Sequence, residues 1–263
     1  MRKMLYKLFQ GDCLDVMRGF PAARVDMIFA DPPYRLSNDG LTCQSGRWVS
    51  VNKGEWDRSE GLVADHEFHL AWLGECKRLL KDDGTLWVSG TYHAIFSIGY
   101  ALQLLGFRIL NDICWFKPNA SPNLSRRYFT ASHETLIWAA KSSSSRHYFD
   151  YDAMRAENAG KQMRSMWPIP STPAREKTFG KHPTQKPLTL LRRIVSASSR
   201  PGDIVLDPFC GSGTTGLAAV EQNRRFIGID TSHEYLQLAK KRIESVRLQS
   251  DRVMEAAELY IAN

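Results

Sequence analysis

The amino-acid sequence predicts an α/β protein built on a doubly wound, mainly parallel sheet. Apolar runs of strand length alternate with longer helical patterns over most of the 263 residues, and this alternation is typical of parallel strands joined by crossover helices. Two of the runs lead into Asp31-Pro-Pro-Tyr34 and Asp207-Pro-Phe-Cys-Gly211, which suit loops at strand ends better than strand interiors. With 43% hydrophobic residues, the chain can bury a large core.

The expected elements follow one another along the chain. We expect strands at Leu5–Phe9, Val25–Ala30, Thr85–Ser89, Phe107–Trp115, Thr135–Ala139, Ile204–Leu206 and Arg225–Ile229. We expect helices at Cys13–Gly19, Ala64–Leu80, Ala94–Leu105, Leu188–Ser198 and Thr214–Gln222, and a long one from His233. Because parallel neighbours need crossover helices, these helices should cover both faces of the sheet.

Two stretches interrupt the alternation. Residues 35–62 are rich in Gly, Ser, Asn and Asp without a sustained period, which predicts a long loop. Residues 142–180 begin with four serines and combine prolines and aromatic residues with basic ones, which predicts an inserted subdomain. The longest run without charge, Gly84–Phe107, contains several polar residues. We therefore interpret it as strand, turn and buried helix and not as a membrane span.

Positive charge is concentrated in one part of the chain. The formal net charge is +7, and 15 Lys and Arg against 5 Asp and Glu lie between Lys117 and Arg200, whereas the remainder is mildly acidic. A basic segment on an acidic body predicts a surface for a polyanion such as nucleic acid. A merely solvated surface explains the charge count equally well.

Cysteine usage favours a reducing compartment. The five cysteines at positions 13, 43, 76, 114 and 210 are odd in number and form no Cys-x-x-Cys pair, which argues against a disulfide framework and against a zinc site. No apolar segment follows Arg2 and Lys3, so no secretory signal is expected. We expect a cytoplasmic protein without a metal.

A nucleoside-type ligand is predicted by the segment 207–216 together with Asp230. Gly211, Gly213 and Gly216 spell GxGxxG between an expected strand and an alanine-rich helix. Glycines there let the backbone approach a ligand, and the helix N-terminus offers N–H groups. Asp230 ends the next expected strand, where a carboxylate can accept both hydroxyls of a ribose. These residues alone fit either a nicotinamide cofactor or S-adenosylmethionine.

The Asp31–Tyr34 motif predicts a stiff loop at the end of the strand Val25–Ala30, because two prolines cannot continue a central strand. Such a strand exit can be purely structural. It also has a chemical use, since Asp31 and the carbonyl of Pro32 can together accept both hydrogens of the exocyclic amine of adenine. Tyr34 can then stack on a base that has been flipped out of its helix.

Together, four motifs resemble those of the beta-group DNA adenine-N6 methyltransferases. They are Asp31–Tyr34, His182-Pro-Thr-Gln-Lys-Pro187, Asp207–Thr215 and Gly228–Asp230, in the order typical of that group. The resemblance implies a circularly permuted fold of the S-adenosylmethionine-dependent methyltransferase type. One domain would then comprise a catalytic half (1–141), a small target-recognition insertion (142–180) and a cofactor-binding half (181–263).

The resemblance also implies roles for single residues. Asp31, Pro32, Pro33 and Tyr34 would be catalytic, with Asp31 as the acceptor that orients the target amine. The cofactor S-adenosylmethionine would be bound by Asp12, Cys13, His182, Thr184, Lys186, Asp207, Phe209, Cys210, Gly211, Ser212, Gly213, Thr214 and Asp230. DNA would be contacted by Asn123, Arg126, Arg127, Tyr128, Lys161 and Arg164. Structural interpretations remain open for Asp12 as an N-cap and for His182–Pro187 as the cap of the following helix.

Further segments narrow the resemblance to two subgroups. Asn111–Pro118, Pro122–Thr130, His133–Trp138 and Lys161–Arg164 are similar to those of DpnA-like enzymes, which methylate GATC, and of CcrM-like and HinfI-like enzymes, which methylate GANTC. The Pro-Asn-Leu-Ser stretch favours the first. We therefore expect adenine methylation in GATC, with GANTC second, in a restriction-modification system. DNA is the expected partner, with a second copy of the chain as a further one.

Two other activities fit parts of the sequence. Cytosine-N4 methylation uses the same geometry, but enzymes of that type more often have Ser where Asp31 stands. An NAD-dependent oxidoreductase fits Gly211–Asp230 alone, and it leaves Asp31–Tyr34 and the basic segment without a role. Adenine-N6 methylation accounts for all three features.

Overall fold

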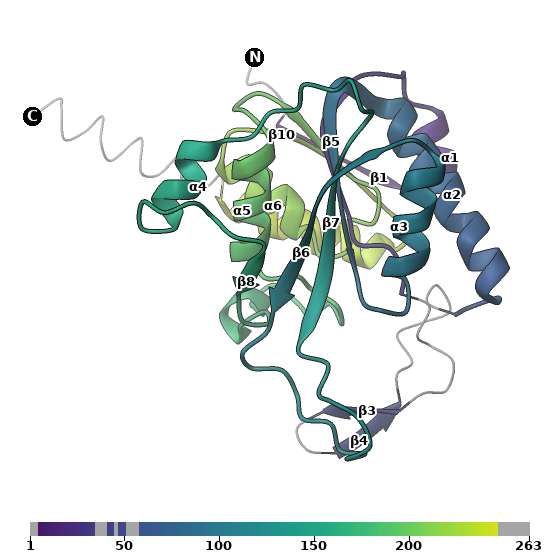
Figure 1. Ribbon diagram of the computed structural model, residues 1–263, viewed down its shortest axis with the longest axis vertical. Helices are drawn as coiled ribbons and strands as arrows, with labels where there is room; N and C mark the ends of the chain where they lie inside the picture. The colour runs from purple at the N-terminus through teal and green to yellow at the C-terminus, as the bar shows by residue number, and fades with distance from the viewer. Residues whose placement is uncertain (1–4, 35–40, 45–46, 51–57, 247–263) are drawn as a thin grey trace, which may run out of the picture.

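The computed structural model describes residues 5–34, 41–44, 47–50 and 58–246. Its centre is an eight-stranded sheet in the order β1-β10-β9-β2-β5-β7-β6-β8 (Figure 1). The strands are β1 (Tyr6–Gln10), β2 (Val25–Ala30), β5 (Leu80–Gly90), β6 (Arg108–Phe116), β7 (His133–Ala140), β8 (Met166–Pro168), β9 (Ile204–Asp207) and β10 (Arg225–Asp230). Only β7 runs antiparallel to its neighbours in this sheet. The predicted mainly parallel sheet is confirmed.

Helices cover both faces of the sheet, as a doubly wound fold requires (Figure 1). On one face lie α1 (Cys13–Arg18), α2 (Leu62–Leu79) and α3 (Ile95–Leu104); on the other lie α5 (Leu188–Ser198), α6 (Thr214–Glu221) and the helix 233–246. Strand β2 shows why. Its alternate residues Met27 and Phe29 belong to the core under α5 and α6, whereas Ile28 and Ala30 belong to the core under α1, α2 and α3. A strand buried on both faces has a continuous apolar run.

Every expected strand and helix has a counterpart, and β5 shows the largest shift of an end. It begins at Leu80, directly after α2, and not at Thr85. The strand also includes Lys81, Asp82, Asp83 and Gly84. Residues of these types are depleted in strands, so the sequence does not predict a strand there. At the start of β5, Leu80 pairs with Val25 of β2.

The predicted loop at residues 35–62 is wrong for part of its length. β3 (Leu41–Gln44) and β4 (Arg47–Ser50) pair antiparallel as a hairpin, with Gln44 opposite Arg47. The sequence signal was the dipeptide Ser-Gly between two short runs that contain β-branched and aromatic residues. Residues 35–40, 45–46 and 51–57 of the predicted loop lie outside the described residues.

The segment 142–180 contributes α4 (Tyr151–Glu157), strand β8 and the short 3-10 helix η2 (Ala174–Lys177). β8 adds an edge strand to the main sheet by pairing with β6, where Trp167 lies opposite Trp115. The indole Nε1 of Trp115 donates to the carbonyl of Ile169 at 2.7 Å. Whether this segment recognises the target sequence stays a prediction.

The uncharged stretch Gly84–Phe107 comprises the end of β5, a turn and α3, as predicted. Among the described residues, no helix has the length and apolar character needed to cross a membrane.

The sheet topology places a binding crevice between β9 and β2. These strands are neighbours, but β2 continues through α2 to β5 on one side, and β9 continues through α6 to β10 on the other. Ligands of open α/β sheets bind beyond the carboxyl ends of the strands at such a switch point. Asp31 follows β2, and Asp207 ends β9.

Close packing of α6 on β10 gives a first test. A Cβ at Gly216 would lie 2.5 Å from ring carbons of Phe226 and 2.7 Å from Cδ1 of Ile243, whereas a Cβ at Gly74, in α2, would meet nothing within 4 Å. We expect Gly216→Ala to lower the free energy of unfolding by about 1–3 kcal/mol through overpacking. The matched control Gly74→Ala should raise it by roughly 0.5–1 kcal/mol. Urea unfolding measures both, and equal midpoints would contradict the packing.

Candidate active site

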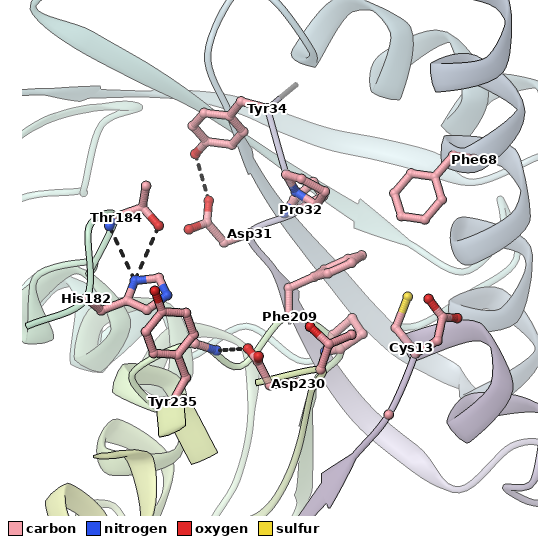
Figure 2. A pocket seen from close by; sticks show the side chains of 16 residues that line it. Cys13, Asp31, Pro32, Tyr34, Phe68, His182, Thr184, Phe209, Asp230 and Tyr235 are labelled. Atoms are coloured by element: carbon pink, nitrogen blue, oxygen red, sulfur yellow. Dashed lines mark hydrogen bonds between the residues drawn. The ribbon is translucent and has the colours of Figure 1, made fainter. Parts of the chain in front are cut away.

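A cavity of about 310 Å³ opens at the carboxyl ends of β1, β10, β9 and β2. Side chains from both halves of the chain surround it (Figure 2). Its lining comprises Gly11, Asp12, Cys13, Asp31, Pro32, Pro33, Tyr34, Phe68, His182, Thr184, Pro208, Phe209, Gly211, Asp230, Thr231 and Tyr235. The volume and the mixture of apolar walls with a few carboxylates are typical of small-molecule sites.

Asp31 is held at the wall of this cavity by two partners. The phenol of Tyr34 donates to Asp31 Oδ1 at 2.7 Å (Figure 2), and Lys186 Nζ donates to Asp31 Oδ2 at 2.6 Å. The Asp31 side chain is 15% exposed. Burial raises the pKa of Asp31, and the ammonium of Lys186 opposes that rise. The carboxylate is therefore oriented and only partly neutralised.

Glu134, on β7, lies on the far side of Lys186 and was not anticipated. Its Oε2 accepts from Tyr34 at 2.9 Å and lies 3.4 Å from Lys186 Nζ, while its Oε1 accepts from Lys117. Burial acts to raise the pKa of Glu134, but the charges of Lys186 and Lys117 outweigh it and lower the pKa to about 2. The sequence held no periodic signal for a charged residue on a strand that is otherwise largely buried.

Asp207 is buried below the glycine-rich loop. Its Oδ2 accepts from the hydroxyl of Thr215 at 2.5 Å and its Oδ1 from the amide of Phe209 at 3.0 Å. Burial raises the pKa of Asp207 to about 7. Both oxygens thus hold the loop that α6 follows, which gives Asp207 a structural task inside the site.

Asp230 fixes the opposite end of the same loop. Its Oδ2 accepts from the amide of Gly211 at 2.7 Å and its Oδ1 from the amide of Ser232 at 2.8 Å. Gly211 has φ +50°, and a Cβ there would lie 3.0 Å from Nε2 of His182. A side chain at position 211 would therefore be strained and would collide with the ring that walls the cavity.

Arg242, from the helix 233–246, clamps the turn into α6. Its Nη1 donates to the carbonyl and hydroxyl of Ser212 at 2.7 and 2.9 Å and to the hydroxyl of Thr214 at 2.9 Å. Ser212 and Thr214 were predicted as cofactor ligands, and the structure engages their hydroxyls in the loop itself. Arg242 was not predicted as a site residue, because nothing in the sequence of a helix marks which residue will point back to a loop.

The two structural interpretations have different outcomes. Asp12 is the N-cap of α1, and its Oδ1 accepts from the amide of Leu14 at 2.8 Å; that interpretation is confirmed. The segment before α5 does not cap it by a side chain, because the N-cap residue is Pro187. The amide of Leu188 instead donates to Glu176 of η2 at 2.9 Å, so the segment supplies the N-cap residue of α5 but no capping side chain.

The structure brings most of the predicted site residues together. The four motif residues Asp31, Pro32, Pro33 and Tyr34 line the cavity, with Asp12, Cys13, His182, Thr184, Phe209, Gly211 and Asp230. Lys186, Asp207, Cys210, Ser212 and Thr214 line a small recess beside it. Gly213 lines neither; it has φ +72°, and a Cβ there would meet Ala239 at 2.5 Å. Their individual binding roles stay predictions.

Two aromatic walls were missed. Phe68 comes from α2, and its ring packs near that of Phe209 with 6.4 Å between centroids. Tyr235 lies in the first turn of the helix 233–246, and its ring lies 4.3 Å from that of His182. Tyr235 could have been predicted, because it follows Asp230 by five residues and the helix after a strand end begins beside the binding site. No sequence signal marked Phe68.

The predicted DNA contacts lie away from the cavity, on two surface segments. Arg126, Arg127 and Tyr128 are exposed in the loop that joins β6 to β7, and Lys161 and Arg164 are exposed after α4. Asn123 is used within its own loop: its Nδ2 donates to the carbonyl of Tyr128 at 2.6 Å, and its Oδ1 accepts from the amide of Ser125 at 2.9 Å. The adjacent Phe129 was missed although it is 98% exposed.

Comparison with known proteins identifies the family. The family model described as DNA methylase matches residues 25–241. The chain is 50% identical over 241 residues to the Type II methyltransferase M2.MboI of Moraxella bovis, covering 92% of this chain and 88% of that protein. It is also 50% identical over 239 residues to the Type II methyltransferase M2.DpnII of Streptococcus pneumoniae, covering 90% and 89%.

A solved structure agrees with the fold and the relationship. The crystal structure of the M1.HpyAVI–SAM complex superposes with a TM-score of 0.68 at 31% identity, over 90% of this chain and 98% of that chain. The resemblance found in the four motifs and the predicted fold class are both confirmed. The chain therefore belongs to the DNA methylase family.

Proposed function

We propose that this DNA methylase transfers a methyl group from S-adenosylmethionine to N6 of an adenine flipped out of DNA. The observation that carries the proposal is the placement of Asp31. Its carboxylate is oriented by Tyr34 and Lys186 at the wall of a cavity whose other wall is formed by the loop after Asp207 and by Asp230. One cavity thus offers an amine acceptor and a nucleoside cradle side by side.

The residues present fit the cofactor. The bend at Gly211 keeps the backbone close to the cavity, where a Cβ would contact His182. Each oxygen of Asp230 accepts one amide N–H, and a carboxylate oxygen has a second lone pair with which to accept a ribose hydroxyl. His182 and Tyr235 would wall the methionine end. When bound, S-adenosylmethionine supplies an electrophilic methyl group on its sulfonium.

The protein's own part is alignment. Asp31 and the carbonyl of Pro32 would accept the two hydrogens of the adenine amine, which turns the nitrogen lone pair toward the methyl carbon. No strong base is needed beforehand, because the amine can lose its proton after transfer. Asp31, whose pKa is raised by burial, is placed to receive that proton. Asp31 in place of Ser favours adenine over the cytosine-N4 alternative.

The target sequence is GATC in this proposal. The support is the likeness of the Pro122–Thr130 stretch to GATC enzymes and the exposure of Arg126 and Arg127 in the loop between β6 and β7. Arginine commonly reads guanine through O6 and N7. The Type II names of the relatives support a role of this chain in a restriction-modification system. The DNA substrate and the free cysteines among the described residues support a cytoplasmic location in this proposal.

We further propose a homodimer that pairs through α3. Phe96, Tyr100 and Leu104 are spaced four residues apart on this helix and are 56–76% exposed. The helix has no charged residue, so a second copy laid against it meets no like charge. A self-complementary apolar ridge suits a two-fold interface.

Asp31→Ala tests the assignment of the acceptor. We expect methyl transfer to GATC DNA to fall by at least a hundredfold, because losing an aligned charged acceptor costs about 3 kcal/mol or more of barrier. Isothermal titration should show that binding of S-adenosylmethionine largely survives. In the control Asp230→Asn the pattern should reverse, with cofactor binding lost first. Near-normal turnover by folded Asp31→Ala would exclude the assignment.

Arg127→Ala, with Arg126→Ala beside it, tests the recognition loop. We expect relaxed sequence choice, because each lost base contact costs about 1–3 kcal/mol of discrimination. Binding to GATC and to a one-base variant is compared at low and moderate salt, with Lys161→Ala as the control that weakens both DNAs alike and lowers the salt dependence. Uniform loss in both arginine variants would refute base readout. Modified adenines outside GATC in an expressing host would refute the target.

Phe96→Lys tests the dimer. Placing a positive charge on the ridge should make the protein a monomer at micromolar concentration, because two like charges would meet at the two-fold axis. Sedimentation velocity measures the mass, with exposed Leu62→Lys on α2 as the control. A wild-type monomer would rule the dimer out.

A further inference from the structure

The acceptor carboxylate is one member of a group of four charges, of which Glu134 and Lys186 are buried and Asp31 and Lys117 partly buried. Lys186 Nζ lies 2.6 Å from Asp31 Oδ2 and 3.4 Å from Glu134 Oε2. Lys117 binds the other oxygen of Glu134. Asp31 therefore never meets Lys186 alone: the ammonium is shared between two carboxylates that come from β2 and β7.

Glu134 also holds the tyrosine of the motif. Its Oε2 accepts from the Ser89 hydroxyl at 3.2 Å and lies 2.9 Å from the Tyr34 phenol oxygen, whose single proton it shares with Asp31 Oδ1 at 2.7 Å. Both groups that orient Asp31, Lys186 and Tyr34, thus also contact Glu134, and they lie 3.0 Å from each other. Glu134 itself does not line the cavity, so it does not touch the reacting atoms.

Stability alone does not account for this arrangement. Taking several charges out of water costs free energy that their attraction only partly returns, and well-packed apolar residues often do as well in such places. Glu134 is 8% exposed and Lys186 is 7% exposed. A buried, charge-balanced network placed beside the acceptor fits a task in the reaction better.

We propose that Glu134 is a positioning residue for methyl transfer, which acts by holding Lys186 and Tyr34 so that Asp31 keeps its orientation and its electron density for the target amine. The inference deepens the proposed function and rests on it. Without Glu134, Lys186 would pair with Asp31 alone and would draw the carboxylate away from the amine. Tyr34 would lose one of the three groups, Glu134, Ser89 and Lys186, that hold its phenol beside Asp31.

Glu134→Gln, which keeps the shape and removes the charge, is the primary test. We expect kcat on GATC DNA to fall about tenfold to a hundredfold, as for loss of a charge-assisted hydrogen bond. Affinity for S-adenosylmethionine and KM for DNA should stay within about twofold, which separates a transition-state effect from a binding effect. Thermal unfolding and cofactor titration show that the variant is folded.

The pH profile gives a readout that a purely structural role would not move. The groups around Asp31 are Lys186 and Tyr34, which lower its pKa, and Glu134, which raises it; Asp207 also lies within electrostatic reach. In Glu134→Gln the raising charge is lost while Lys186 remains, so the pKa of Asp31 falls. The acidic limb of kcat/KM should therefore move to lower pH.

Lys117→Met and the double variant provide the matched control. Lys117 binds Glu134 and is not among the recorded partners of Asp31. If Glu134 only neutralised Lys117, removing both charges would restore activity. We expect the double variant to stay as slow as Glu134→Gln, and Lys117→Met alone to be slowed less.

Two results would overturn the proposal: folded Glu134→Gln with a normal rate and an unmoved acidic limb, or a double variant that regains the wild-type rate. A wild-type chain that fails to methylate adenine in GATC would instead overturn the proposed function, so the two failures are distinguishable.

Discussion

Convergence of acidic residues at one edge of a parallel sheet is the constraint on which this site depends. β2 runs into Asp31, β9 and β10 end in Asp207 and Asp230, and Asp12 follows β1. Because parallel strands present their carboxyl ends together, the four side chains must share one region. Carboxylates that lie so close together cannot stay buried unless each one is neutralised or hydrogen-bonded.

The fold meets this constraint in a different way for each acid. Asp12 caps a helix near the surface, and Asp230 receives two backbone amides. Asp207 is buried with a hydroxyl and an amide as partners, and its pKa is raised to about 7. Asp31 alone receives a cation, from Lys186. Asp31, the acid with the charged partner, is the one proposed to bind the substrate amine, whereas Asp207 and Asp230 hold the loop before α6 through backbone amides.

Sequence patterns predicted the sheet, its helices and the motif residues because periodicity and strand-end motifs are local properties. They failed where the answer depends on register or on long-range packing. Glu134 reaches Tyr34 because β7 lies antiparallel beside β5, in a register that pairs Leu136 with Ser89. A one-residue slip of this register would turn the Glu134 side chain to the other face of the sheet. Phe68 and Arg242 reach the site from helices whose local pattern specifies only a buried face. The β3–β4 hairpin was hidden by loop-like composition.

The same register couples the acceptor to the exposed basic loop. Lys117 follows β6 and Glu134 lies at the start of β7, so the loop between them, which carries Arg126, Arg127 and Tyr128, begins and ends at one ion pair. The amide of Lys117 also donates to the carbonyl of Ser132 at 2.7 Å, which closes the loop at its base. In Figure 1 this loop extends to the end of the molecule where the β3–β4 hairpin lies. Contacts lead from the base of this loop at Lys117 to Glu134, and from Glu134 through Lys186 and Tyr34 to Asp31. The contact route from the base of the exposed basic loop to Asp31 is four side chains long, and each of its links is a charged or charge-assisted contact.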